Sequence, residues 1–388
     1  MAIPISYNLR SLAVRRTTTV LTVLGIALTV AVFLASLALI NGLRDAFQST
    51  GAPLHILVLR KGCSSELGSM MPREVFRALM FKPGIARDSN GQDPLASQEL
   101  VTTVKLVAEK YGAGGDVTLR GLLPVGIELR HLKLREGRWF QPGQFEVVVG
   151  RLLAHRYPSA RVGRRLRFGK GEWTVVGVME GGRTVVNSEI FADLNQVASQ
   201  FNRPNLLNSI LLRVADPVTV PAMLTTLNED QRLNVTAQTE KAYYDRQAAS
   251  GLPLLSLGLF VSIVMAVGSS FAAMNTMYAA VSRRVKEVGT LRVLGFSRSN
   301  ILLSFLMESL LLSFWGGLIG GLLVLPLNYV TSSVGNLAAV SETLFTFQVG
   351  PSTLVWGILF ALLIGALGGL LPARMAARKE IMLSLRGV

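Results

Sequence analysis

Four long apolar segments stand out along the chain, and a stretch of mixed polarity separates the first of them from the other three. Each segment reaches the roughly 20 mostly apolar residues that a membrane-spanning α-helix needs. The segments are residues 17–43, 251–282, 301–330 and 353–373. The pattern predicts a membrane protein with four transmembrane α-helices in a 1+3 arrangement.

The composition agrees with this interpretation. Half of the 388 residues are hydrophobic, 16% are charged, and the mean hydropathy is +0.44. An average soluble domain has roughly 25% charged residues. The chain as a whole is therefore too apolar for a soluble protein.

The long stretch between the first two apolar segments, residues 44–250, has the pattern of a mixed α/β domain. Glycines on both sides of Lys170 indicate a hairpin, and residues 84–96 indicate an exposed loop. The β-rich runs are 54–59, 101–107, 117–121, 146–150, 164–168 and 172–178, and the helical patterns are 73–80, 151–157, 188–201 and 220–229. We expect two interleaved α/β lobes.

Basic residues gather in three segments that the positive-inside rule assigns to the cytoplasm. These segments are residues 1–16, 283–300 and 374–388, whereas the link 331–352 contains no lysine or arginine. We therefore expect cytoplasmic termini, and the domain 44–250 and the link 331–352 on the outer side. Because this topology requires cationic residues on the cytoplasmic side, the net charge of +15 does not indicate that the protein binds nucleic acid.

The sequence offers no pattern of catalytic residues. The three histidines, His55, His131 and His155, have spacings unlike those of metal-binding motifs, and no GxxxxGK[ST] phosphate loop occurs. The single cysteine, Cys63, cannot form an internal disulfide and is interpreted as an ordinary small residue. We expect no catalytic site, no metal and no directly bound cofactor, so that the chain is not an enzyme by itself.

Two features of the apolar segments indicate helix packing. Glycines recur at spacings that let helix backbones approach closely, and they serve either a dimer face or packing within the chain. They are Gly316, Gly317, Gly320 and Gly321 in the third segment, and Gly365 and Gly369 in the fourth. Glu308 is the one ionisable residue inside any predicted span, and a carboxylate there needs a partner or a proton. We expect it to pair, with an arginine near the cytoplasmic end as a candidate, and proton coupling is the alternative.

The segment SRRVKEVGTLRVLGFSRSNILLSFLMESLLLSFWGGLIGG resembles the region between the second and third spans of MacB/FtsX-type permeases of ABC transporters, the type VII group. The pattern of that family falls on Glu287, Val288, Gly289, Arg292, Leu294 and Gly295, then Met307-Glu308 and Gly316-Gly317. The segment LLPARMAAR at residues 370–378 is similar to the closing motif of the family. The following residues, EIMLSL, lack the proline that the family has there.

The resemblance implies a separate cytoplasmic ATPase subunit that carries ATP and Mg²⁺, and a bacterial inner-membrane location. Residues 285–294 would form a short coupling helix that contacts this ATPase. An apolar anchor would come from Val285, Val288, Leu291 and Val293. The residues expected to serve ATPase coupling are Arg283, Arg284, Lys286, Glu287, Val288, Gly289, Leu291, Arg292, Leu294 and Gly295.

The resemblance also implies a second permease copy, with a homodimer favoured, and membrane lipid and a periplasmic adaptor as further candidate partners. Residues 41–49 and 238–250 would extend the first two spans into the outer domain. ATP-driven motion would then export a periplasmic or membrane-derived substrate. The alternative is a mechanotransmitter that moves no cargo and regulates a cell-wall hydrolase or a sensor.

Overall fold

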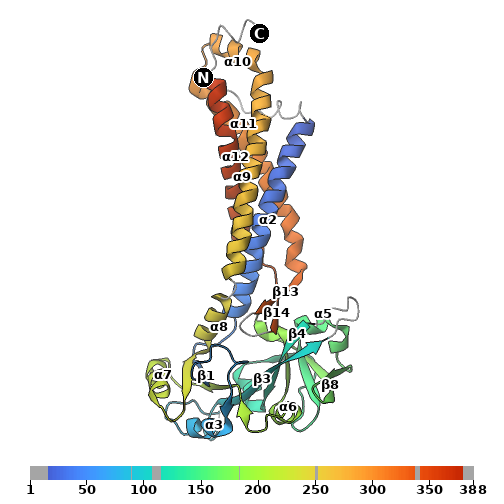
Figure 1. The fold of residues 1–388 in the computed structure, drawn as a ribbon, viewed down its shortest axis with the longest axis vertical. Helices are drawn as coiled ribbons and strands as arrows, with labels where there is room; N and C mark the ends of the chain where they lie inside the picture. The colour runs from blue at the N-terminus through green and yellow to red at the C-terminus, as the bar shows by residue number, and fades with distance from the viewer. Residues whose placement is uncertain are drawn as a thin grey trace. The chain divides into compact units, whose positions relative to one another are not determined.

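The computed structural model describes residues 16–88, 90–106, 115–182, 184–249, 252–336 and 341–378. The chain divides into two compact units. A helical unit contains the residues up to Asn41, Pro253–Val330 and the residues from Phe347 on, and an α/β unit contains Gly42–Leu252 and Thr331–Thr346. Figure 1 shows the elements of both units.

One ten-stranded sheet, counted over the described residues, runs through the whole α/β unit. Its strand order is β12-β1-β11-β3-β4-β9-β6-β8-β5, and β7 pairs with β8. The strands are β1 (His55–Arg60), β3 (Ala96–Leu106), β4 (Gly115–Leu122), β5 (Lys133–Gly137), β6 (Glu146–Gly150), β7 (Arg165–Phe168), β8 (Gly171–Glu180), β9 (Glu189–Asp193), β11 (Ser209–Arg213) and β12 (Val235–Thr239). Two short strands, β2 (Met71–Pro72) and β10 (Leu206–Leu207), pair with each other outside this sheet.

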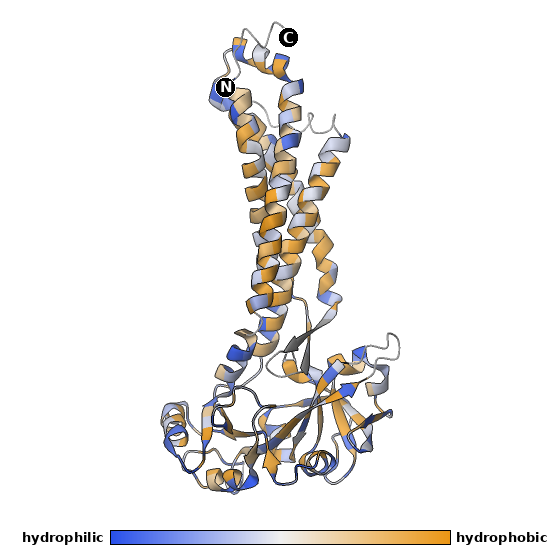
Figure 2. Ribbon diagram, in the orientation of Figure 1, coloured by the Kyte–Doolittle hydropathy of each residue, from blue (hydrophilic) through white to orange (hydrophobic). Residues whose placement is uncertain are grey.

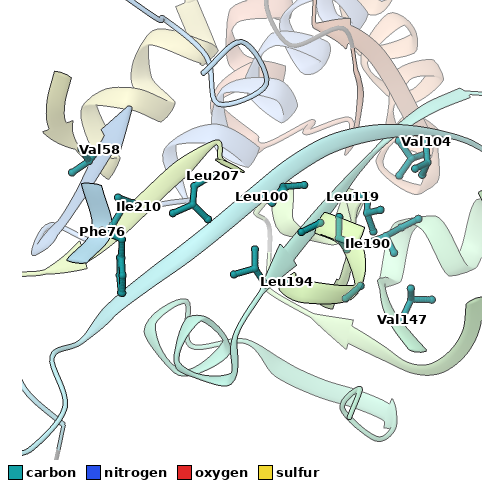
Figure 3. Packing of buried hydrophobic residues seen from close by; sticks show 14 of the residues in the cluster. Val58, Phe76, Leu100, Val104, Leu119, Val147, Ile190, Leu194, Leu207 and Ile210 are labelled. Carbon is teal, nitrogen blue, oxygen red and sulfur yellow. The ribbon is translucent and has the colours of Figure 1, made fainter. Parts of the chain in front are cut away.

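Short helices connect these strands. They are α3 (Arg73–Met80), α4 (Pro124–Leu129), α5 (Arg151–Arg156), α6 (Leu194–Gln200), α7 (Val220–Glu229) and α8 (Glu240–Ala249), with 3₁₀ turns η1 (Pro158–Ala160), η2 (Val185–Ser188) and η3 (Pro217–Thr219). Side chains of α3, α6 and α7 join the main hydrophobic core with every second residue of the strands. Figure 3 shows this packing, with Phe76 of α3 beside Ile210 and with Leu194 of α6 among the labelled members of the cluster.

The sequence pattern located most of these elements. Strand 146–150 and helices 73–80 and 220–229 have the predicted bounds, and the hairpin across Lys170 is confirmed as β7 and β8. The helix predicted at 188–201 is wrong in its first half, because Glu189–Asp193 forms strand β9 in the middle of the sheet. A single sheet is continuous through the unit, and the division into two lobes stays a prediction.

The link that was expected over 331–352 is more than a connection between spans. It forms a hairpin of β13 (Thr331–Asn336) and β14 (Ser341–Thr346), and this hairpin belongs to the α/β unit. Leu344 and Phe345 of β14 are buried, at 2% and 1% exposure. The α/β unit therefore takes residues from two separate parts of the chain.

In the helical unit, four of the described helices are long and apolar enough to cross a membrane. They are α2 (Arg16–Gln48), α9 (Leu252–Arg283), α11 (Arg298–Val324) and α12 (Pro351–Arg378), and Figure 2 shows their hydrophobic composition. A short helix, α10 (Val285–Val293), lies between α9 and α11, and the 3₁₀ turn η4 (Leu325–Tyr329) follows α11. The order confirms the predicted arrangement of one span, a large domain and three spans.

Candidate functional site: the loop helix and its buried ion pair

The loop between α9 and α11 folds into a helix with well-defined ends. Gly295 follows α10 with a φ of 91°, a conformation that glycine adopts without steric cost. The amide of Phe296 donates to the carbonyl of Leu291 at 3.1 Å, and the amide of Gly295 donates to that of Arg292 at 3.2 Å. This is the Schellman motif that ends many helices. The glycine of the Leu294-Gly295 pair in the sequence motif is thus explained by the turn that ends α10.

One side of α10 packs against three of the long helices. Val288, which is 4% exposed, joins a buried cluster with side chains from α9, α11 and α12. The other members of the cluster are Met277, Val281, Ile301, Phe305, Ala373, Ala376 and Ala377. The residue that was expected to anchor an ATPase therefore anchors α10 to its own chain.

A buried ion pair fixes the start of α10 to α11. The Nη1 of Arg284 lies 3.1 Å from the Oε2 of Glu308, and the two residues are 8% and 3% exposed. Glu287 approaches the same guanidinium at 3.8 Å from the exposed side. The pairing of Glu308 with an arginine at the loop end of its span is as the sequence indicated. Arg284 was expected to contact the ATPase from the surface of the loop. Instead it is buried, and its guanidinium pairs with Glu308 of the same chain.

The opposite side of α10 is open. Arg283, Lys286 and Glu287 are exposed, and the apolar side chains of Val293 and Leu294 are 63% and 69% exposed. Leu291 is half-buried and Gly289 is buried. Arg292 is also half-buried, and its Nη1 donates to the carbonyl of Phe296 at 3.2 Å, which stabilises the turn after α10. A short helix that exposes both apolar and cationic side chains offers a surface that suits a protein partner.

The glycines of α11 and α12 are used for packing within the chain. A Cβ at Gly320 would lie 2.7 Å from the carbonyl oxygen of Ala27 in α2, and one at Gly317 would lie 2.8 Å from Cβ of Ala361 in α12. The remaining glycines face close neighbours in the same way: Gly316 faces Ile26, Gly321 faces Leu354, Gly365 faces Ser313, and Gly369 faces Ser309. Of the two alternatives for these residues, packing within the chain is the one that the contacts favour.

The α/β unit contains a second cluster of charged residues, which lies on the sheet face opposite the main core. Arg120 contacts Glu66 and Glu189 at 2.8 Å each and also Glu99. Arg130 contacts Glu99 at 2.8 Å and Glu240 at 2.9 Å, and Glu240 accepts a 2.8 Å bond from Nδ1 of His55. We call these seven residues the ionic network: His55, Glu66, Glu99, Arg120, Arg130, Glu189 and Glu240.

Charge compensation keeps two carboxylates of the ionic network, Glu66 and Glu240, ionised. Burial by itself would raise the pKa of Glu66, but the charge of Arg120 and its hydrogen bonds outweigh burial and lower the pKa to about 2. The pKa of Glu240 is lowered in the same way, since Arg130 and His55 outweigh its burial.

The sequence motifs did not reveal this network, because its members come from distant positions. The cross-strand register, with Val101 opposite Arg120 and Thr118 opposite Glu189, brings them together. The sequence did contain one signal for the network, namely charged residues in or near β-rich runs. Arg120 lies inside the run 117–121, and Glu99 lies just before the run 101–107.

Two family profiles match the chain. The MacB-like periplasmic core domain matches residues 19–229, and the FtsX-like permease C-terminal domain matches residues 259–381. The first covers more than half of the chain.

Individual relatives are similar over most of the chain. The ABC transporter permease YknZ of Bacillus subtilis is 24% identical over 97% of both chains. The macrolide export ATP-binding/permease protein MacB of Bdellovibrio bacteriovorus is 24% identical over 97% of this chain and 60% of its own length. The protein of the same name from Bradyrhizobium diazoefficiens is 30% identical over 58% of this chain and 35% of its own. The chain thus spans about a third to three fifths of the length of these MacB relatives.

Two solved structures are similar to parts of the chain. The extracellular domain of YknZ from Gram-positive bacteria covers 48% of this chain and 100% of its own, at 15% identity and a TM-score of 0.36. The periplasmic region of MacB from Actinobacillus actinomycetemcomitans covers 51% and 94%, at 12% identity and a TM-score of 0.38. Scores this low do not define a common fold.

Proposed function

Since the chain belongs to the family of the MacB-like periplasmic core domain and the FtsX-like permease, it is an ABC transporter permease, and we propose that it converts ATP hydrolysis by a separate subunit into motion of its α/β unit. The chain has no GxxxxGK[ST] phosphate loop, so hydrolysis is assigned to a partner. In this proposal the α/β unit is extracytoplasmic, and both termini and α10 are cytoplasmic.

The observation that carries the proposal is the two-sided construction of α10. Its outer side exposes Lys286, Val293 and Leu294, and the exposed Arg283 ends α9 just before it. Its inner side is fixed by Val288 and by the pair of Arg284 with Glu308. A force applied to the outer side is therefore passed to α9, α11 and α12, because close-packed elements transmit displacement.

Chain continuity then carries the motion to the α/β unit. Helix α2 continues without a break to Gln48, so its last residues, from Gly42 on, are part of the α/β unit. A Cβ on Gly42 would overlap the carbonyl oxygen of Thr346, which means that the end of α2 touches the hairpin from between α11 and α12. Helix α8, whose first residue Glu240 belongs to the ionic network, precedes α9.

A second copy of the chain is the proposed membrane partner. The glycines of α11 and α12 already contact other helices of the same chain. In the most apolar 18-residue stretch of α9, by contrast, only 6% of the residues are buried. Exposed apolar side chains of α9, such as Phe260 and Phe271 at 64% each, are available to a homodimer or to lipid.

Export of a periplasmic or membrane-derived substrate is the favoured outcome of this motion. The MacB relatives are named as macrolide exporters, and a periplasmic adaptor would complete the export route. The alternative is regulation of a cell-wall hydrolase or sensor, and the two are distinguished by whether ATP-dependent efflux of a labelled substrate occurs in reconstituted vesicles.

The proposal is tested by breaking the outer side of α10. With the cognate ATPase reconstituted in nanodiscs, V293E/L294E should abolish permease-stimulated ATP hydrolysis, because it buries two carboxylates in the contact. The matched control is Val218→Glu, an apolar residue of the α/β unit that is 81% exposed. Unchanged stimulation and unchanged ATPase co-purification in the double variant would contradict the assignment of α10.

A further inference from the structure

A cavity of about 350 Å³ lies next to the ionic network, and His55, Arg130 and Glu240 of that network are among the residues that line it. Its volume is within the range of small-molecule sites. Its wall combines the loop after α2, the turn between α4 and β5, and the end of β8 with Gly181 and Gly182. It includes Gly51, His131, Lys133 and Glu180. These residues all belong to the α/β unit.

The acidic residues that line the cavity already have ion-pair or hydrogen-bond partners within the protein. Glu180 pairs with Arg151 at 2.6 Å and with Arg135 at 3.6 Å. The two carboxylate oxygens of Glu240 accept bonds from Arg130, from His55 and from the amide of Ala52. Neither carboxylate is left to attract a cation.

Two basic residues that line the cavity are in the opposite situation. Lys133 and His131 are exposed, and neither side chain forms an ion pair or a hydrogen bond within the described parts of the chain. Once the internal ion pairs are set aside, the cavity presents an uncompensated ammonium group and an imidazole. Such a wall is complementary to a negatively charged ligand.

His131 also has an unusual backbone conformation. It follows α4 with a φ of 47°, and the amides of His131 and Leu132 donate to the carbonyls of Glu128 and Ile127 as in a Schellman motif. Glycine is the usual residue at this position, because a side chain there is strained. In the described chain, the other non-glycine residues with a positive φ are Asn202 and Asn234, and asparagine tolerates this conformation well. A strained residue on a cavity wall points to use of its side chain.

We propose that this cavity is a binding site for a small anionic ligand with a carboxylate or phosphate group, and that Lys133 and His131 hold the anionic group. The loop Ser49–Ala52 in the cavity wall directly follows α2, and Glu240, which also lines the cavity, begins α8. A bound ligand would join the two places where the first and second spans enter the α/β unit. That regulatory consequence rests on the function proposed above, whereas the binding itself does not.

Binding is tested with the full chain in a maltoside detergent, by isothermal titration with inorganic phosphate and with acetate at constant ionic strength. We expect saturable binding of at least one probe, and the tighter of the two identifies the ligand as a phosphate or a carboxylate. Lys133→Gln and His131→Gly should each weaken binding about tenfold, the effect of losing one charge-assisted hydrogen bond. Lys170→Gln, an exposed lysine on the β7–β8 turn, is the control that keeps wild-type affinity.

The glycine variant separates a binding role from a structural one. His131→Gly should raise the melting temperature because it relieves a left-handed backbone at a bulky side chain, and it should also lose affinity. Asn234→Gly, at a residue that tolerates this conformation, should leave both the melting temperature and the affinity nearly unchanged. The proposal is overturned if neither probe saturates, if both cavity variants bind as tightly as the wild type, or if His131→Gly lowers the melting temperature. ATPase stimulation measured with and without the bound probe tests the regulatory consequence separately.

Discussion

Removal of Arg284 should damage coupling although it leaves the exposed side of α10 unchanged. The guanidinium lies 3.1 Å from Glu308, and at an effective dielectric constant of about 20 this separation gives about 5 kcal/mol of attraction. Desolvation offsets much of that energy when the pair forms, but loss of one partner leaves a buried charge uncompensated, at a cost of about 3–5 kcal/mol. Arg284→Gln should therefore loosen the start of α10 from α11.

The effect should depend on which partner is removed. Glu308→Gln should be milder, because the amide oxygen can still accept from Arg284 and because Glu287 lies 3.8 Å from the same guanidinium. The double variant R284Q/E308Q should lose less than the sum of the single variants, with a coupling energy on the order of 0.5–3 kcal/mol.

Two assays follow this prediction. Thermal unfolding in nanodiscs measures the stability of each variant, and ATP hydrolysis by the co-reconstituted ATPase measures coupling. We expect Arg284→Gln to lower the melting temperature and to reduce stimulation while the ATPase still co-purifies. A wild-type melting temperature and full stimulation in Arg284→Gln, with additive effects in the double variant, would refute the reasoning.

Three further outcomes are expected. Gly320→Val should disrupt the packing of α11 on α2, because a Cβ there would lie 2.7 Å from a backbone oxygen. Gly268→Val should be tolerated, because no atom lies within 4 Å of a Cβ at that position. Melting temperatures of the two variants in detergent test this difference. Gly42→Val should likewise lower ATPase stimulation by separating α2 from β14, and Gly25→Val on the same helix should not, so equal activities would argue against this contact. Because the folded-state pKa of Glu66 is depressed to about 2, its stabilisation is present above pH of about 4.5 and is lost as the pH falls toward 2. Near-ultraviolet circular dichroism of the full chain should follow that loss, and Glu66→Gln should flatten the profile over this range.

The sequence was most informative where one physical constraint acts alone. The length of the apolar segments predicted the four helices and the 1+3 order, since a bilayer requires uninterrupted apolar segments. Alternating strands and glycine-flanked turns gave most elements of the α/β unit. The strand at Glu189–Asp193 was missed because a central strand is buried on both faces and does not alternate, so its pattern joined that of the next helix.

The hydrophobic and polar pattern of the sequence could not predict contacts between residues that are far apart in the chain. Residues 331–346 look like a polar link, and only contact with the rest of the α/β unit makes them a hairpin of it. The ionic network joins residues from His55 to Glu240 through strand register, which no local spacing encodes. Arg284 looked like one of several exposed cations, and its burial depends on the path of α10 across α11.

The most direct test of the account uses the single cysteine of the chain, Cys63, which lies in the α/β unit. An environment-sensitive fluorophore on Cys63 reports motion of this unit when ATP is added to the permease–ATPase complex in nanodiscs. We expect a spectral change in the wild type that is absent in Arg284→Gln, although the ATPase remains bound. The same change in both proteins, or no change in either under active hydrolysis, would contradict transmission from α10 to the α/β unit.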